Sequence, residues 1–207
     1  METKISEIRK EYTRGKLTQC TINDNPFEQF EEWLNDAIAH NADEPTAMIV
    51  ATVSAEGHPS TRTVLLKGVE NNKFIFFTNY ESRKGKQLAD NPYISLSFVW
   101  HKLERQVHIE GKAEKCLNQV SDTYFSSRPY KSKIGARISP QSRVIRAFVK
   151  EVFKLAGHEI RRPDNWGGFA VTPTRFEFWQ GRESRLHDRI QYILQEDGSW
   201  KQERLAP

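Results

Sequence analysis

The stretch TRTVLLKGVENNKFIFFTN, residues 61–79, decides the fold class. Two runs rich in β-branched and aromatic residues, 61–69 and 73–79, are separated by ENNK, whose asparagines favour a turn. Further runs of this kind stand at 46–53, 93–100, 105–116, 175–179, 185–194 and 200–205. Six or more strands joined mostly by short turns predict an antiparallel barrel with helices around it. The βαβ alternation of a dinucleotide-binding sheet is missing, as is a GxGxxG motif.

Helices are expected between and around these strands. A short charged helix is predicted over roughly 3–12, and Asn25 is expected to cap a second helix that has Pro26 at its first position. The apolar stripe of that second helix is predicted to consist of Phe27, Phe30, Leu34, Ala37 and Ile38. Two more helices are predicted near 118–127 and 142–156, with a loop between them.

The composition is that of one globular domain spanning 1–207. Of 207 residues, 37% are hydrophobic and 11% aromatic. The formal charge of +4 suits small anionic ligands or serves solubility alone, and a nucleic-acid binder usually carries a larger excess on one face. Cys20 and Cys116 form no zinc-type pair, which fits a reducing compartment. The charged beginning and the lack of a long apolar run predict a cytoplasmic protein.

Phosphate-binding groups and aromatic residues are more prominent than nucleophiles. The sequence has no HExxH, GxSxG or Walker A motif, and its six histidines are scattered, so no metal site is predicted. A cofactor that brings its own reactivity fits such a chain.

The stretch NYESRKGKQLADNP, 79–92, predicts a short helix capped by Ser82. Arg83 and Lys84 then lie in its first turn, with Lys86 one turn on. Cations beside the free N–H groups of a helix start form a phosphate site, or else a solvated helix end. In RTVLLK, 62–67, alternation places Arg62 and Lys67 on opposite faces, where they bind two ligands, two parts of one, or merely extend into solvent.

Three further stretches carry polar groups. Gln106 in LERQVHIEG shares a face with Glu104 and His108; its amide suits a heterocycle, though a polar exposed face is the alternative. In TYFSSRPYKS, 123–132, three groups that suit a phosphate recur at four-residue intervals, although Pro129 argues against a continuous helix. These are Tyr124, Arg128 and Ser132. Ser142 in QSRV either binds an anion or caps a helix.

RESRLHDR, 182–189, poses an electrostatic problem. If it is a strand, Arg185, His187 and Arg189 share one face and repel one another, which predicts an anionic or electron-rich ligand there. Trp179 stands just before this stretch, either beside that ligand or in the core.

Taken in order, these motifs resemble a known family. IRKEYTRG, PTAMIVATV, RTVLLKG, FFTNYESRKGKQL, LERQVHIEGKAE, YFSSRP, WGGF, FWQGRESRLHDR and the terminal RLAP closely resemble the pyridoxine (pyridoxamine) 5′-phosphate oxidases, from about residue 5 to 207. The resemblance implies a homodimeric, FMN-binding split β-barrel with flavin at the subunit interface. It also implies oxidation of pyridoxine 5′-phosphate or pyridoxamine 5′-phosphate to pyridoxal 5′-phosphate by hydride transfer to the flavin, with oxygen reduced to hydrogen peroxide.

The resemblance also assigns residues. It implies FMN contacts from Arg62, Thr63, Val64, Leu65, Leu66, Lys67, Phe77, Thr78, Arg83, Lys84, Gln106, Gln141, Ser142, Trp179 and Arg189. It implies substrate-phosphate contacts from Lys67, Tyr124, Arg128 and Ser132. Arg185 and His187 would be the catalytic residues near the pyridine ring, and Arg9 and Tyr12 belong to a mobile segment, 1–20, that covers the substrate. The cationic row would then be a wall between two bound anions.

Three alternatives stay open at this point. One is a split-barrel flavin oxidase with another substrate, of the phenazine-pathway type. Another is a flavin or pyridoxal-phosphate binding protein without catalysis. The third, an RNA- or DNA-binding barrel, is disfavoured by the modest charge.

Overall fold

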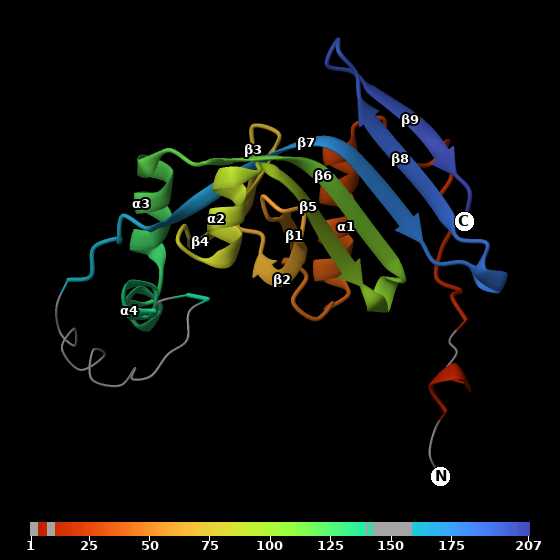
Figure 1. Cartoon of the computed structure of the whole chain (residues 1–207). Helices are drawn as coiled ribbons and strands as arrows, with labels where there is room; N and C mark the ends of the chain where they lie inside the picture. Colours follow the sequence, from red (N-terminus) through yellow and green to blue (C-terminus); the bar gives the residue numbers. More distant parts are fainter. Residues whose placement is uncertain (1–3, 8–10, 140, 143–158) are drawn as a thin grey trace. The chain divides into compact units, whose positions relative to one another are not determined.

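The computed structural model describes residues 4–7, 11–139, 141–142 and 159–207, and it is mainly β with flanking helices, as predicted (Figure 1). The strands are β1 (Ala47–Val53), β2 (Pro59–Leu65), β3 (Gly68–Glu70), β4 (Lys73–Asn79), β5 (Tyr93–Trp100), β6 (Arg105–Lys115), β7 (Trp166–Gln180), β8 (Asp188–Leu194) and β9 (Trp200–Leu205). The helices are α1 (Pro26–Ala39), α2 (Arg83–Asp90), α3 (Asn118–Ser127) and α4 (Tyr130–Ile138), with short 3-10 turns at Ile5–Glu7, His101–Leu103 and Glu183–Arg185. No helix in these described ranges is long and apolar enough to span a bilayer.

The strands form one sheet in the order β2-β1-β5-β6-β7-β4-β3, and β8 pairs with β7 and with β9. β4 and β7 are antiparallel, with Phe77 opposite Gly168. β7 and β8 are also antiparallel, with Trp179 opposite Arg189. The predicted antiparallel pairing is therefore confirmed for these strands.

Several boundaries differ from the sequence prediction. The run 61–69 is split after Leu65, because the chain turns so that the Lys67 N–H donates to the Ile75 carbonyl at 2.8 Å. β7 begins at Trp166, although two glycines and a proline in its first half lower its strand propensity. The expected strand 185–194 begins only at Asp188.

Two helix predictions need correction, and a third lies almost entirely outside the described residues. The structure has only the turn Ile5–Glu7 where a helix over 3–12 was predicted, and residues 8–10 lie outside the described ranges. The loop expected after α3 contains α4. Gln141 and Ser142 form a turn, and the rest of the helix expected over 142–156 lies outside the described residues.

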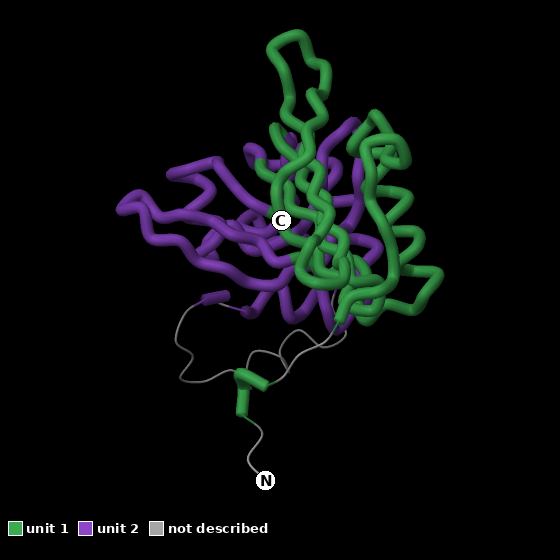
Figure 2. Tube along the Cα trace, turned by 90° about the vertical axis from the view of Figure 1, so that its right-hand side faces the viewer, with its two compact units in different colours: residues 1–48, 96–110, 174–207 green, residues 49–95, 111–173 purple. Residues whose placement is uncertain are grey.

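The chain divides into two compact units, coloured separately in Figure 2: residues 1–48, 96–110 and 174–207 form unit 1, and 49–95 and 111–173 form unit 2. The prediction of a single domain over 1–207 stays a prediction, as does the covering role of residues 1–20.

In unit 1, helix α1 packs its aromatic face on the sheet. The Asn25 Oδ1 accepts from the Phe27 N–H at 2.9 Å, which confirms the predicted cap. Phe30 lies edge-on to Phe98 with ring centroids 4.9 Å apart. Trp33, which the predicted stripe omitted, is only 3% exposed, whereas Ile38 of that stripe is 50% exposed. The buried face is therefore rotated slightly from the one that was predicted.

In unit 2, the pairing of β4 with β7 depends on small residues in WGGF. A Cβ at Gly167 would lie 2.1 Å from the Tyr80 Oη and 2.9 Å from the Ser121 Oγ. Both groups serve the neighbouring residue: the Tyr80 hydroxyl donates to the Gly168 carbonyl at 3.1 Å, and the Gly168 N–H donates to the Ser121 Oγ at 3.1 Å. Any side chain at 167 would displace this network.

Candidate functional site

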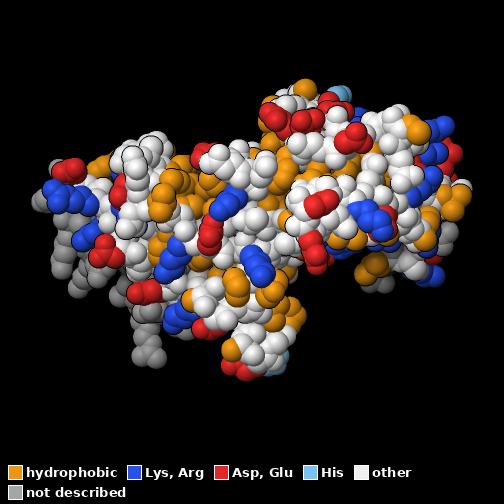
Figure 3. Space-filling view, turned by 90° about the horizontal axis from the view of Figure 1, so that it is seen from above, with side chains coloured by type: hydrophobic (Ala, Val, Ile, Leu, Met, Phe, Trp, Pro, Cys, Tyr) orange, Lys and Arg blue, Asp and Glu red, His pale blue; other side chains and the backbone are white. Residues whose placement is uncertain are grey.

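Unit 2 contains a pocket of about 940 Å³ with a uniform charge. Five cationic side chains line it, and none of its described lining residues is acidic. The five are Arg62, Lys67, Arg83, Lys84 and Arg128. On the face drawn in Figure 3, by contrast, acidic and basic side chains are interspersed. The pocket is therefore built for anionic ligands and does not simply share the charge of the surface.

Arg62, on β2, is held rigidly at the pocket wall. Its Nη1 donates to the Thr52 Oγ1 at 2.7 Å and to the Val50 carbonyl at 3.1 Å, while its Nη2 donates to the Ser60 Oγ at 2.7 Å. Both hydroxyls in turn donate to the Gln87 Oε1, at 2.6 and 2.8 Å. This network orients the planar guanidinium before any ligand arrives.

Lys84 lies at the start of α2, where Ser82 is the predicted N-cap and its Oγ accepts from the Gly85 N–H at 3.3 Å. Lys84 is only 5% exposed, and its Nζ donates to the Thr78 Oγ1 at 2.7 Å. Burial, and then the neighbouring Arg62 charge, lower the pKa of Lys84 to about 8. A negative charge in the pocket would restore the ordinary stability of the ammonium form.

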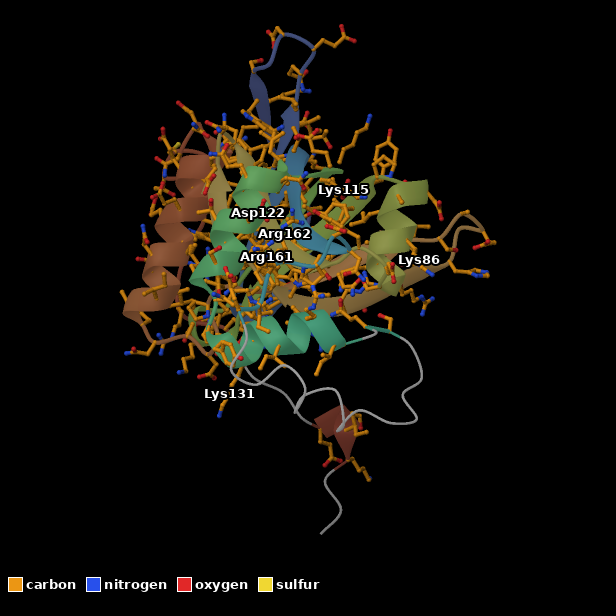
Figure 4. The ribbon with its side chains drawn as sticks, turned by 90° about the vertical axis from the view of Figure 1, so that its left-hand side faces the viewer. Lys86, Lys115, Asp122, Lys131, Arg161 and Arg162 are labelled. Carbon is orange, nitrogen blue, oxygen red and sulfur yellow. The ribbon has the colours of Figure 1, made fainter. Side chains whose placement is uncertain are left out.

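The cations beside α2 have no acidic partner among the residues that the structure describes. Within the described part of the chain, Arg62, Arg83 and Lys84 form no ion pair with a carboxylate. Burial and the Arg83 charge lower the pKa of Arg62, as expected for cations that repel one another. Lys86, in contrast, is exposed on α2 and is not a lining residue (Figure 4).

The junction of α3 and α4 contributes further ligand-binding side chains to the pocket. The helix breaks at Pro129, which is the N-cap residue of α4, yet Tyr124, Arg128 and Ser132 all line the pocket. The Arg128 guanidinium lies over the Trp166 ring, 4.6 Å from its centroid. Its Nη1 is buried and has no hydrogen-bond partner among the described residues, and burial lowers the pKa of Arg128. A buried donor without a partner is costly, which indicates a ligand acceptor at this point.

Unit 1 holds a separate aromatic cluster. The Tyr12 ring lies 5.6 Å from the rings of Trp179 and His187, and those two rings are 4.7 Å apart. Gly181 makes room for this arrangement, since a Cβ there would lie 2.8 Å from the Tyr12 ring. Trp179 is half-buried at this cluster, and its contact with a ligand stays a prediction.

The expected row of cations on one strand face is also wrong. Arg185 and His187 precede β8, so Arg189 alone of the three lies in the strand. The Arg189 Nε donates to the Glu177 carboxylate at 2.9 Å. Burial alone would raise the pKa of Glu177, but the hydrogen bond and charge of Arg189 prevail and lower it. The charge of Arg189 is thus balanced within unit 1.

Comparison with known proteins gives the same family over almost the whole chain. Residues 34–162 match the family described as pyridoxamine 5′-phosphate oxidase, and residues 166–207 match the pyridoxine 5′-phosphate oxidase C-terminal dimerisation region. The chain belongs to this oxidase family. The pyridoxine/pyridoxamine 5′-phosphate oxidase of Bacteroides thetaiotaomicron is 62% identical over 98% of this chain and 99% of its own length. That of Porphyromonas gingivalis is 53% identical over the whole of both chains, each covered at 100%.

Solved structures agree with the predicted split barrel. The crystal structure of PhzG from Burkholderia lata 383, in complex with tetrahydrophenazine-1-carboxylic acid, has a TM-score of 0.87 and 25% identity, and covers 93% of this chain and 98% of that one. A pyridoxamine 5′-phosphate oxidase-related, FMN-binding protein from Nostoc punctiforme shares the fold, with a TM-score of 0.74 and 16% identity over 86% of this chain and 97% of its own. The predicted family and fold class are therefore confirmed.

Most residues assigned from the resemblance to this oxidase family meet in the unit 2 pocket. The lining includes Arg62, Thr63, Val64, Leu65, Lys67, Phe77, Thr78, Arg83, Lys84, Tyr124, Arg128, Ser132, Gln141 and Ser142. Leu66 is only 5% exposed and is not among the lining residues. β2 ends at Leu65, so the predicted alternation does not extend to Lys67, which lines the same pocket as Arg62. Trp166 and Asn79 also line the pocket, although neither was assigned to it from the sequence. The sole sequence signal for Trp166 was its place in the motif WGGF.

The other assigned residues lie elsewhere. Gln106, on β6 in unit 1, has its Oε1 3.3 Å from the His108 Nε2. Glu104 precedes β6 and is buried, so it does not extend the polar strand face as predicted; its Oε2 accepts from the Thr13 N–H at 2.8 Å. Arg9 lies outside the described residues.

Proposed function

We propose that this protein oxidises pyridoxine 5′-phosphate and pyridoxamine 5′-phosphate to pyridoxal 5′-phosphate, with FMN as cofactor and oxygen reduced to hydrogen peroxide. The observation that carries the proposal is the pocket lined by five cations and no described carboxylate. Arg62, Arg83 and Lys84 lie at or beside the start of α2, whereas Arg128 lies at the α3–α4 junction and Lys67 lies between β2 and β3. Five cations in one pocket suit two phosphorylated ligands, a cofactor and a substrate.

The group beside α2 fits the phosphate of FMN. Lys84 is a buried ammonium that pairs with no carboxylate in the described ranges, and Arg62 presents a guanidinium already fixed by hydroxyl groups. Arg83 and the first N–H groups of α2 add donors on the same side of the helix start. When bound, FMN supplies the two-electron acceptor for the oxidation and passes the electrons to oxygen.

The remaining assigned FMN contacts belong to the same proposal. They are Thr63, Val64, Leu65, Leu66, Lys67, Phe77, Thr78, Gln106, Gln141, Ser142, Trp179 and Arg189. The Thr78 hydroxyl supports this assignment, because it accepts from the Lys84 ammonium and donates to the Gln141 Oε1 at 3.2 Å. A polar chain of this kind orients the ammonium toward its ligand.

The group at the α3–α4 junction fits the substrate phosphate. Arg128 offers a buried donor that has no partner among the described residues, and Tyr124 and Ser132 add a phenol and a hydroxyl. Lys67, which lines the same pocket, adds an ammonium. Holding the phosphate fixes where the pyridine ring lies, so that binding energy is used for positioning. Arg185 and His187 would contact that ring.

We further propose that the protein is a cytoplasmic homodimer with FMN at the subunit interface, and that residues 1–20, with Arg9 and Tyr12, cover the substrate. The match of residues 166–207 to a region named for dimerisation supports the dimer. Two hydrogen bonds support an ordered part of the covering segment: Glu104 accepts from the Arg14 N–H at 3.0 Å and Asp188 from the Leu17 N–H at 3.0 Å.

An oxidase acting on a phenazine-type substrate is the second candidate, since the PhzG structure is similar over 93% of this chain. The ligand named for PhzG is a carboxylic acid whose name contains no phosphate, whereas the pocket here is lined by five cations. That difference favours the phosphorylated substrates.

The test is turnover by the purified protein reconstituted with FMN. We expect pyridoxal 5′-phosphate to form from pyridoxine 5′-phosphate with matching oxygen uptake, and unphosphorylated pyridoxine to serve as the control that reacts far less efficiently. Bound flavin without product would move the assignment to another oxidase substrate. Binding of both ligands without oxygen uptake would indicate a binding protein.

A further inference from the structure

Asp188, the first residue of β8, joins three distant segments of unit 1. Its carboxylate is buried, with a residue exposure of 3%. The Oδ1 accepts from the Arg204 Nη2 at 2.9 Å, and the Oδ2 accepts from the Arg182 Nη1 at 2.9 Å and from the Leu17 N–H at 3.0 Å. A buried carboxylate with two cations and one backbone donor is fully paired and rigid.

The turn that this carboxylate holds is strained. Ser184 and Arg185 have φ of 56° and 60°, in the left-handed region that side chains other than glycine rarely adopt. Leu186 is 67% exposed, so it contributes little packing to the turn. Strained residues persist where surrounding contacts determine them, and the Arg182–Asp188 ion pair is such a contact at the start of this turn.

The same turn fixes the tautomer of His187. The Arg182 backbone N–H donates to the His187 Nδ1 at 3.1 Å. A ring nitrogen that accepts a hydrogen bond carries no proton, so the neutral ring has its proton on Nε2. Tyr12 and Trp179 border the ring. His187 therefore presents one defined N–H donor.

We propose that Asp188 is a positioning residue for the oxidation. By pairing with the Arg182 side chain, Asp188 keeps the Arg182 N–H on the His187 Nδ1 and thereby keeps the imidazole proton on Nε2, so that His187 offers this N–H as its donor. Asp188 acts through Arg182 and not on the substrate itself. The importance of His187 rests on the proposed function, whereas its tautomer does not.

Three variants separate this role from general stabilisation. Asp188→Asn keeps the shape of the side chain but removes its charge. Arg182→Met keeps the backbone N–H and the length of the side chain but removes the ion pair. Arg204→Gln is the matched control, because it removes the other cation of Asp188, which comes from β9 and not from the turn. Each is measured for bound FMN, for kcat and KM with pyridoxine 5′-phosphate, and for the His187 ring nitrogens by NMR of protein with nitrogen-labelled histidine.

We expect Asp188→Asn and Arg182→Met to lower kcat by about tenfold to a hundredfold, the range for a misplaced group near the reaction. Both variants should show His187 as a mixture of tautomers, with FMN content unchanged. Arg204→Gln should keep the Nε2–H tautomer and a kcat within about twofold of the parent protein. If Asp188→Asn does not fold, the result with Arg182→Met alone tests the proposal.

The proposal is overturned if Arg182→Met or a folded Asp188→Asn keeps the single tautomer, whatever happens to kcat, or if the tautomer mixes while kcat stays unchanged. It is also overturned if Arg204→Gln has the same effects as the other two. A parent protein without oxidase activity would refute the proposed function, but the NMR comparison would still test the hold of Asp188 on His187.

Discussion

Replacing Arg128 by methionine should move stability and activity in opposite directions. The buried Nη1 has no partner among the described residues, and an unsatisfied buried donor costs roughly 1–3 kcal/mol. The contact of the guanidinium with the Trp166 ring, 4.6 Å from its centroid, stabilises the folded protein by about 0.5–1 kcal/mol. Methionine keeps an unbranched apolar stem against that ring. The net expectation is that Arg128→Met stabilises the ligand-free protein by about 1 kcal/mol, or roughly 2–4 °C in Tm for a chain of this size.

The same substitution should damage catalysis. A hydrogen bond to a charged group contributes about 1.5–3 kcal/mol, so losing Arg128 as a phosphate ligand should lower kcat/KM for pyridoxine 5′-phosphate by about tenfold to a hundredfold. FMN affinity should change little, because Arg128 is assigned to the substrate phosphate. Thermal unfolding of the FMN-free protein and steady-state kinetics measure the two effects separately.

Lys131→Met is the matched control, since Lys131 lies on α4, the helix that begins just after Arg128, is exposed (Figure 4) and does not line the pocket. It removes the same charge and should leave both Tm and kcat/KM nearly unchanged. A clear loss of stability in Arg128→Met, or an unchanged kcat/KM, would refute the reasoning that a substrate phosphate satisfies this buried donor.

Three other predictions concern the cofactor, the fold and the turnover. Lys84 has a pKa of about 8, and a bound phosphate would raise it, so FMN affinity should fall by up to about tenfold per pH unit as pH rises above 8. In a fluorescence titration, Lys84→Met should abolish this pH dependence. An equal slope in both proteins would contradict the prediction. Gly167→Ala should lower the free energy of unfolding by about 1–3 kcal/mol, because the new Cβ meets the Tyr80 hydroxyl. Gly135→Ala, whose Cβ would have no atom within 4 Å, should not destabilise the protein. Denaturant unfolding that ranks the two variants the other way would refute this prediction. Arg185→Ala should lose about a hundredfold in turnover while retaining FMN, measured by kinetics and flavin content; equal turnover would exclude its role at the pyridine ring.

Local signals in the sequence predicted local structure well. Asn25 and Ser82 were identified as N-caps because a cap needs only a short polar side chain beside a helical pattern, and both side chains accept the expected N–H. Pro129 correctly marked the break after α3. The helix that follows was missed, because only Ile134 within α4 is buried, which leaves almost no apolar periodicity to detect.

The environment of the site residues depends on contacts that sequence spacing cannot show. Lys84 was read as one of several cations at a helix start, and nothing local indicated that it is buried beside Arg62. The repulsion expected around Arg189 was wrong because its partner, Glu177, comes from the paired strand β7. The resemblance to the family identified the residues that meet in the pocket. Their burial, their partners and the Arg128 donor that has no described partner could be found only in the structure.

The most direct test of the central claim is the visible spectrum of the FMN-loaded protein, recorded without oxygen before and after adding pyridoxine 5′-phosphate. We expect the flavin absorption to bleach on addition of the substrate and to return when oxygen is admitted, with pyridoxal 5′-phosphate formed in proportion. A flavin band that stays unbleached at saturating pyridoxine 5′-phosphate and pyridoxamine 5′-phosphate would contradict it.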